Sequence, residues 1–294
     1  MPLRTDPGSS AVDVVIPSHG RPNFLRETIE SVLHQSVTPA SLCVVSDDAH
    51  PEVGAFMDEL NIRESTLPIY FLSRTDRAGA SLSRNLGAEQ GSAPFIAFLD
   101  DDDLWGPTYL EEALQASERT DADFVVTGIE RFSDSGVSGV MVPDGNLRPK
   151  DVFMRSPRVT GSSIVCRRSA FTALEGFDVS LPVANDRDFF LRALEADKTY
   201  VVNSSPLVRV RSHGQGQLTN PTPMRAAGIA AFLHKHKAKY TYFESRNLRY
   251  ASARTHLSVS SSLSHQAWWF AASLLSWSPS AGRQIPLITS RRRP

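Results

Sequence analysis

Cysteine is scarce in this sequence, which has only Cys43 and Cys166 among its 294 residues. Each lies beside valine in an apolar, strand-like run, so both are expected to be buried thiols rather than halves of a disulfide. Long hydrophobic runs are also absent, since no stretch approaches the roughly 20 apolar residues that a membrane-spanning helix needs. Residues 1–11 are polar and lack the apolar core of a signal peptide, so a cytoplasmic location is expected.

Extremes of composition are missing as well. Hydrophobic residues make up 41% and charged residues 21% of the chain, which excludes collagen-like, disordered and membrane-spanning classes. A chain of this length can bury about three quarters of its unfolded surface. We therefore expect a large folded core.

Acidic residues are nearly absent from the C-terminal part. Residues 232–294 carry ten Lys or Arg side chains and a single acid, Glu244, although the whole chain has a net charge of −1. This split predicts an acidic body that uses a metal ion and a basic region able to meet an anionic surface, at the inner face of a membrane for example. A nucleic-acid partner is not expected, because the basic residues belong to no recognisable nucleic-acid-binding fold.

Strand-like and helix-like patterns alternate through the first half of the chain. Expected strands cover 12–16, 41–46, 69–72, 95–99 and 124–127, and expected helices cover 22–35, 53–60, 82–89 and 109–117. This alternation is typical of an α/β fold, a Rossmann-like, mostly parallel sheet with helices on both faces. Ligands bind such sheets at the carboxyl ends of the strands.

The second half is less regular. Residues 133–150 are rich in Gly, Ser, Asp and Pro and are expected to form a surface loop. Expected strands at 162–166, 199–202 and 207–210 accompany expected helices at 170–174 and 186–195, and three more helices are expected at 224–236, 243–259 and 266–277. We expect one large domain over 1–221, divided near residue 106 into two halves, and a helical, basic extension over 222–294.

The segment Asp100–Asp103, directly after an apolar strand, is the strongest chemical signal. Adjacent carboxylates repel one another, and a divalent cation such as Mg²⁺ or Mn²⁺ that also binds substrate phosphates can neutralise them. A solvated acidic turn that caps the next helix is the alternative. Two weaker signals accompany it. Asp47 and Asp48 follow an earlier strand, where they either bind a nucleobase or a ribose or form a simple Asx turn. Arg84 either binds a diphosphate or is simply solvated.

Together, these elements resemble family 2 glycosyltransferases with the GT-A fold. The resemblance is carried by VVIPSHGRPNFLRETIESVLHQ, VVSDD, SRNLGAEQGSAPFIAFLDDDDLW and NDRDFFLR, and it extends from about residue 12 to about residue 236. It implies an inverting transferase that moves a sugar from a nucleoside diphosphate to an acceptor hydroxyl with Mn²⁺ or Mg²⁺. It also implies that residues 1–221 are the catalytic domain, with a donor half, which binds the nucleotide sugar, over about 12–106 and an acceptor half over about 107–221. The acceptor, whether a sugar, a lipid-linked glycan or a small molecule, stays open.

The resemblance also implies site residues. The residues implied for the nucleotide sugar are Pro17, Ser18, Arg21, Asp47, Arg84, Asp100 and Asp101. Asp102 is implied as a metal ligand, with His213 in the loop that closes over the diphosphate, and Asp186 as the catalytic base. Asn185 stands where the family commonly has Glu, which removes a carboxylate that would raise the pKa of the base. On the acceptor side, Trp105 beside the metal motif either stacks on a sugar ring or packs beneath the acceptor helix.

Trp268, Trp269 and Trp277 cluster within the basic region. A helix with this composition either lies at a membrane interface or docks on protein, including a second copy in a homodimer.

Three rival functions remain. A phosphatase with an aspartate nucleophile needs its acidic motif on the first strand, a nucleotidyltransferase needs a Gly-rich loop and lysine there, and a non-catalytic nucleotide-sugar-binding or scaffold protein would explain Asn185.

Overall fold

The computed structural model describes residues 11–48, 50–64, 66–76, 79–213 and 221–277. The chain forms two compact units. The first comprises Met1–Pro149, Pro157–Ser180 and Asn185–Gly214, and the second comprises Lys150–Ser156, Leu181–Ala184 and Gln215–Pro294. The sequence suggested a single boundary after residue 221, whereas the structure groups two short earlier segments with the C-terminal helices.

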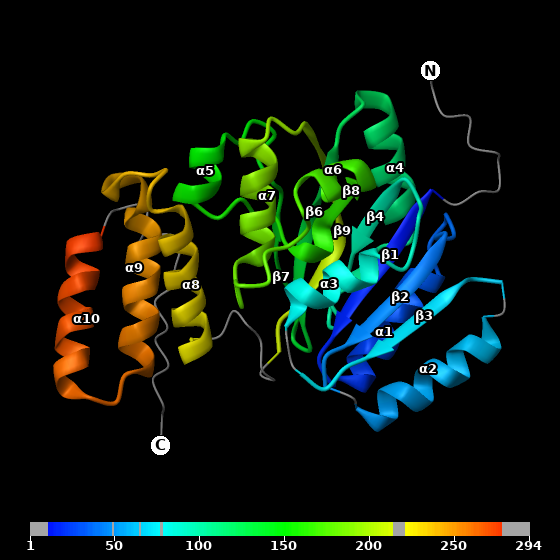
Figure 1. Ribbon diagram of the computed structural model, residues 1–294, viewed down its shortest axis with the longest axis horizontal. Helices are drawn as coiled ribbons and strands as arrows, with labels where there is room; N and C mark the ends of the chain where they lie inside the picture. Colours follow the sequence, from blue (N-terminus) through cyan, green and yellow to red (C-terminus); the bar gives the residue numbers. More distant parts are fainter. Residues whose placement is uncertain (1–10, 49, 65, 77–78, 214–220, 278–294) are drawn as a thin grey trace. The chain divides into compact units, whose positions relative to one another are not determined.

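The first unit is built on a parallel sheet (Figure 1). Strands β1 (Val12–Ser18), β2 (Ser41–Ser46), β3 (Ile69–Ser73) and β4 (Phe95–Phe98) lie in the order β3-β2-β1-β4. Parallel neighbours need crossover connections, which here contain helices α1 (Pro22–Leu33), α2 (Pro51–Arg63) and α3 (Ala80–Ala88). All four strands therefore end at the same edge of the sheet.

The sheet continues beyond β4 with mixed pairing. The order from β4 is β8 (Ile164–Arg167), β6 (Phe124–Ser133), β9 (Tyr200–Arg211) and β5 (Leu104–Trp105), while β7 (Gly136–Met141) pairs with β6. Strand β8 runs antiparallel to β4 and β6, whereas β6 and β9 are parallel. The helical elements of this part are α4 (Tyr109–Thr120), the 3₁₀ turn η1 (Gly161–Ser163), α6 (Arg168–Ala173) and α7 (Asn185–Glu195). The expected α/β fold is thus confirmed.

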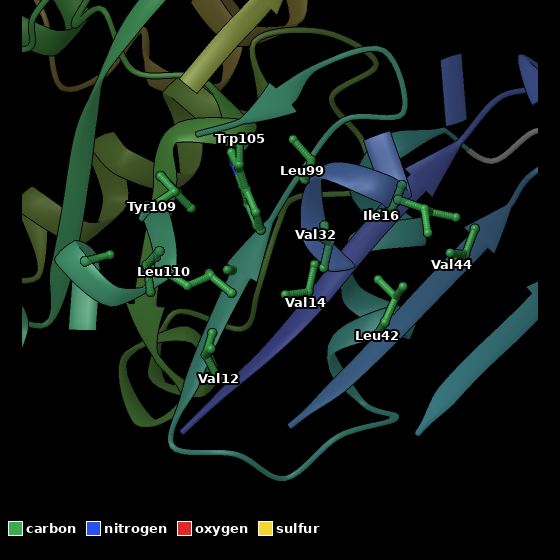
Figure 2. Close-up of a cluster of buried hydrophobic side chains, with 14 of the residues drawn as sticks. Val12, Val14, Ile16, Val32, Leu42, Val44, Leu99, Trp105, Tyr109 and Leu110 are labelled. Atoms are coloured by element: carbon green, nitrogen blue, oxygen red, sulfur yellow. The ribbon is translucent and has the colours of Figure 1, made fainter. Parts of the chain in front are cut away.

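Alternating side chains of β1 pack on opposite faces of the sheet. Val12, Val14 and Ile16 join the main core with residues of α1, α2 and α4 (Figure 2). Val15 faces α3, where a Cβ on Gly87 would come within 2.4 Å of its Cγ1. Glycine at this position therefore lets α3 approach the sheet closely, which fixes the place of Arg84 one turn earlier.

Several expectations for the second half were wrong in detail. Residues 133–150 are not only a loop, because Gly136–Met141 forms a hairpin with the end of β6. The two strands expected at 199–202 and 207–210 are one strand, β9, with a register shift opposite Thr127–Ile129. A local irregularity of this kind breaks the period-two pattern from which strands are recognised.

The second unit consists of helices. They are α5 (Pro149–Met154), of which all but Pro149 belongs to this unit, α8 (Pro223–His236), α9 (Tyr242–Val259) and α10 (Leu263–Ser276). Helix α9 lies between α8 and α10 (Figure 1). The ring of Phe153 stacks on Tyr240 with centroids 3.9 Å apart and on Phe232 at 5.8 Å. These aromatic contacts explain why a short segment before residue 157 belongs with the C-terminal helices.

Both cysteines are free and buried, as expected. Burial, together with the charge of Asp13, raises the pKa of the Cys43 thiol to about 12. Among the described helices, none has both the length and the apolar character needed to cross a membrane.

Candidate active site

Polar residues meet where β1, β2 and β4 end. Ser18 and Asp47 lie at the ends of β1 and β2, and the backbone N–H of Asp47 donates to the carbonyl of Ser18 at 3.1 Å. Asp100 follows β4 after Leu99. Pro17 and Ser18 are buried in the last positions of β1, so the parallel register brings three separate segments to one place, as expected from the strand pattern.

The carboxylates that follow β4 alternate between partly exposed and buried positions. Asp100 and Asp102 have side chains that are 33% and 13% exposed, whereas Asp101 and Asp103 are 1% and 4% exposed. The four residues form a turn, in which the backbone N–H of Asp103 donates to the carbonyl of Asp100 at 3.1 Å. The first pair is therefore available to a ligand, and the second pair supports the surrounding loops.

The buried pair holds the segment in place. Asp103 accepts from the Ser162 hydroxyl at 2.6 Å and from the backbone N–H of Arg211 at 3.0 Å. Asp101 accepts from the backbone N–H of His19 at 2.8 Å. Burial raises the pKa of Asp101 to about 6, although the positive charge of Arg21 opposes the shift.

Arg21 neutralises the acidic segment. Its Nη2 donates to Asp101 at 2.6 Å and its Nη1 donates to Asp102 at 2.5 Å. The Arg21 side chain is 23% exposed, so its guanidinium is mostly shielded from solvent. The predicted association of Arg21 with the strand ends is thus direct, through two carboxylates.

His213, two residues after the end of β9, also contacts Asp102. Its Nε2 lies 3.0 Å from Oδ2 of Asp102, and its ring packs on Phe24 with centroids 4.9 Å apart. Neighbouring ligands of an octahedral Mg²⁺ at about 2.1 Å lie about 3 Å apart, so this oxygen and this nitrogen fit one cation. Residues 214–219 of the expected closing loop lie outside the described residues.

No group of three His, Cys, Asp or Glu side chains within the described segments forms a complete metal site. Mg²⁺ and related cations need only one or two protein ligands when substrate phosphates and water supply the others. The Asp102 and His213 pair meets that requirement, while the guanidinium of Arg21 provides positive charge beside it.

Arg84 joins the acidic segment to the start of α7. Its Nη2 donates to Asp100 at 2.5 Å and its Nη1 donates to Oδ1 of Asn185 at 3.1 Å. The side chain is 4% exposed and runs past Gly161, where a Cβ would lie 2.7 Å from Nη2. Gly161 therefore leaves room for the guanidinium, and Asn185 supplies the acceptor in place of a carboxylate.

Asp186 lies half buried in the first turn of α7. Burial raises its pKa, and the positive charge of Arg84 and the N–H of Arg187, 2.7 Å from Oδ1, work in the opposite direction. The charge of Asp100 raises the pKa further. An aspartate in this setting can accept a proton nearer neutral pH than a solvated one can.

Asp47 has a partner that sequence reasoning missed. Nδ1 of His19 lies 2.7 Å from Oδ1 of Asp47, and the His19 side chain is 59% exposed. Asp47 itself is buried. The position of His19 among the polar residues after the first strand was the available signal, but its pairing with Asp47 depends on the sheet register.

Trp105 lies in the core rather than at the surface. It is 4% exposed, its ring stacks on Tyr109 at 4.3 Å, and its Nε1–H donates to the carbonyl of Ser162 at 2.8 Å (Figure 2). Of the two alternatives raised for this residue, packing beneath a helix agrees with its stacking on Tyr109 of α4.

Comparison with known sequences finds similarity to several glycosyltransferases. TuaG of Bacillus subtilis is 27% identical over 146 residues, covering 50% of this chain and 53% of TuaG. The E. coli protein named UDP-Glc:alpha-D-GlcNAc-diphosphoundecaprenol beta-1,3-glucosyltransferase WfgD is 28% identical over 180 residues, covering 61% and 67% of the two chains. The chain spans about half of TuaG and 24% of a glycosyltransferase from Rickettsia bellii.

Solved structures share the fold. A mannosyltransferase from Pyrobaculum calidifontis, solved with GDP-Man and Mn²⁺, matches with a TM-score of 0.63 at 14% identity and covers 96% of this chain and 81% of that one. TarS of S. aureus, residues 1–349 with UDP-GlcNAc, matches with a TM-score of 0.62 at 15% identity, covering 93% and 83%. The expected GT-A type of fold is confirmed.

The family described as glycosyl transferase family 2 matches residues 13–173, which include the ends of β1, β2 and β4 and the acidic segment after β4. This range exceeds half of the 294 residues, and it confirms the expected class of enzyme. The chain therefore belongs to glycosyl transferase family 2.

Proposed function

We propose that this protein transfers a glycosyl group from a nucleoside diphosphate sugar to an acceptor hydroxyl, with inversion at the anomeric carbon and with a divalent cation. The observation that carries the proposal is the link from Asp100 through Arg84 to the start of α7. Through this link, the charges of Asp100 and of the buried Arg84 guanidinium both act on the pKa of Asp186, the proposed catalytic base.

The donor half, about residues 12–106, binds the nucleotide. Asp47 accepts a hydrogen bond from the nucleobase at the end of β2, beside Pro17 and Ser18. Asp100 lines the donor side of the site, and the buried Asp101 supports it from behind. Solved structures of the same fold contain UDP-GlcNAc or GDP-Man, which supports nucleoside diphosphate sugars as the donor class. The guanidinium of Arg84 supplies positive charge for the diphosphate.

Asp102 and His213 hold the cation, either Mn²⁺ or Mg²⁺. When bound, the cation stabilises negative charge on the departing diphosphate. Mn²⁺ in the related mannosyltransferase structure supports this assignment, as does the 3.0 Å spacing of the two ligand atoms. A bound cation would supply beside Asp102 the positive charge that Arg21 supplies there in this structure.

The reaction is a single displacement. The acceptor oxygen attacks the anomeric carbon, the bond from that carbon to the diphosphate oxygen breaks, and the hydroxyl proton passes to Asp186. The electron pair of the broken bond leaves with the nucleoside diphosphate. Asn185 positions Arg84 through its amide oxygen, and it leaves Asp186 as the acidic group at the acceptor side.

We propose assembly of a cell-surface glycan or glycolipid as the wider role. The name of WfgD specifies a diphosphoundecaprenol-linked acceptor, and that of a 26% identical Haloferax volcanii relative specifies glucosyl-dolichyl phosphate. These names support a lipid-linked acceptor. A non-catalytic protein that binds nucleotide sugars is the second candidate, because Asn185 replaces a carboxylate beside the base.

A panel of UDP- and GDP-sugars with Mn²⁺ tests the proposal. Donor binding is measured by calorimetry, and slow hydrolysis without acceptor is measured as nucleoside diphosphate release. Asp186→Asn should bind the donor normally but release nucleoside diphosphate about a thousandfold more slowly. Asp58→Asn, an exposed carboxylate on α2, is the matched control. Binding with no turnover in the unmodified protein would favour the non-catalytic candidate, and absence of binding would contradict both.

A further inference from the structure

The outward face of α10 is apolar. Leu263 is 83% exposed, Leu275 is 73% exposed and Trp268 is 61% exposed. The α10 apolar face comprises Leu263, Trp268, Phe270, Leu274, Leu275 and Trp277, all at least half exposed. This concentration of large apolar side chains on one helix needs a partner, because water does not favour a contiguous apolar surface.

The fully buried residues of the same helix are small and polar. They are Ser273 and Ser276, while the partly buried Trp269 stacks on His256 of α9 with ring centroids 4.0 Å apart. A helix on the surface of a water-soluble protein places its apolar side inward and its polar side outward. Helix α10 departs from this arrangement, because its large apolar side chains other than Trp269 are at least half exposed.

Cationic residues surround one end of this face. The guanidinium of Arg249 lies over the ring of Tyr242 at 5.1 Å, and the Tyr242 hydroxyl donates to the carbonyl of Leu275 at 3.3 Å. Lys237 and Lys239 are exposed just before α9. Within residues 222–277, Glu244 is the only acidic residue. A positive rim therefore adjoins the apolar face.

The length of α10 determines how it can meet a membrane. Its 14 residues extend about 21 Å at about 1.5 Å per residue, which is shorter than the hydrocarbon core of about 30 Å. Tryptophan, tyrosine and cationic side chains favour the boundary between the acyl chains and the headgroups. The helix therefore suits a position parallel to the membrane surface.

We propose that the α10 apolar face, with its cationic rim, binds the surface of a bilayer that contains anionic lipid. The apolar side chains enter the acyl boundary, and Lys237, Lys239 and Arg249 contact the negative headgroups. A second copy of the chain fits this surface less well, because two such faces would bring like-charged rims together. This inference is independent of the proposed function, since it concerns no residue of the active site.

Sedimentation of the full-length protein with vesicles tests the proposal. Phosphatidylcholine vesicles are compared with phosphatidylcholine vesicles that contain phosphatidylglycerol, at low and high salt. Binding should require the anionic lipid and weaken with salt, because surface charges are screened. Tryptophan emission should shift to shorter wavelength on binding, since Trp268 and Trp277 leave water.

Two sets of variants separate the contributions. Trp268→Ser with Leu275→Ser should weaken vesicle binding by more than about tenfold. Lys237→Gln with Lys239→Gln should weaken binding to anionic vesicles by about thirtyfold. Ile62→Ser is the matched control, because Ile62 on α2 is also 83% exposed. Circular dichroism and nucleotide-induced thermal shifts verify that each variant is folded.

Unchanged vesicle binding in Trp268→Ser with Leu275→Ser would overturn the proposal. Absence of binding to anionic vesicles would also overturn it. In that case, a mass corresponding to a dimer in light scattering, reduced to a monomer by the same double variant, would assign the α10 apolar face to a second copy.

Discussion

Arg21 and Asp102 are 81 positions apart in the sequence, and Nη1 of Arg21 donates to Oδ2 of Asp102 at 2.5 Å. The same carboxylate oxygen lies 3.0 Å from Nε2 of His213. One carboxylate oxygen of Asp102 thus contacts both the positively charged guanidinium of Arg21 and the imidazole of His213, which is a suitable metal ligand. Charge balance at this carboxylate underlies the predictions that follow.

Arg21→Met should destabilise the metal-free protein. Removal of the guanidinium leaves Asp101 and Asp102 as adjacent, unneutralised carboxylates, and the free energy of unfolding should fall by about 3 kcal/mol. Urea denaturation with EDTA measures this loss. Mn²⁺ should restore more stability to Arg21→Met than it adds to the unmodified protein. Equal effects of Mn²⁺ on both proteins would contradict the proposed exchange of positive charge.

Gly161→Ala should displace Arg84 from Asp100. A Cβ at this position would lie 2.7 Å from Nη2 of Arg84, so donor binding should weaken by about tenfold, with a loss of stability of about 1–2 kcal/mol. Calorimetry with the donor measures the first effect. Gly139→Ala is the control, because an added Cβ there meets no atom within 4 Å. Equal donor affinity in both variants would show that Arg84 does not depend on this space.

The pH dependence of transfer should reflect Asp186. Burial raises the pKa of Asp186 above its usual value of 3.8, and a base acts only when ionised. Activity should therefore fall with decreasing pH at a higher pH than for a solvated aspartate. Asn185→Glu adds a neighbouring carboxylate and should move this fall to still higher pH. Asn185→Gln should leave it in place, and a profile that is the same in all three proteins would exclude Asp186 as the base.

Asp103→Ala should lower stability much more than Asp100→Ala. Asp103 is buried and accepts from Ser162 and from the backbone of Arg211, and leaving those donors unpaired should cost about 3 kcal/mol. Asp100 is one-third exposed, so its loss should affect donor binding instead. Chemical denaturation and donor calorimetry on both variants measure this division. Similar stability losses would show that the four carboxylates share one role.

The sequence predicts the N-terminal half of the fold well, because each strand there is a short apolar run followed by a polar end. It predicts the hairpin strand Gly136–Met141 poorly, since GVSGVM has glycine and serine where a strand usually has larger side chains. The single long strand β9 was divided in the prediction because its register shift interrupts the alternation.

The site was partly accessible from the sequence. Asp47, Arg84 and Asp100 follow from strand ends and from the resemblance, whereas the contact of His213 with Asp102 joins residues 111 positions apart. The different roles of Asp101 and Asp102 follow from the turn at Asp100–Asp103 and from the contact of Asp101 with the backbone of His19, which no local pattern predicts. The burial of Trp105 depends on Tyr109 and Ser162, and no local pattern reveals which face of the sheet a tryptophan meets.

Metal-dependent binding of nucleotide is the central claim, and thermal unfolding with UDP and GDP, with and without Mn²⁺, measures it most directly. A ligand that binds the folded state raises the midpoint according to its saturation. One nucleotide should raise the midpoint more with Mn²⁺ than without it, and Asp102→Asn should abolish the Mn²⁺-dependent part while Asp58→Asn retains it. A nucleotide shift that is the same with and without Mn²⁺, or that survives in Asp102→Asn, would contradict the account.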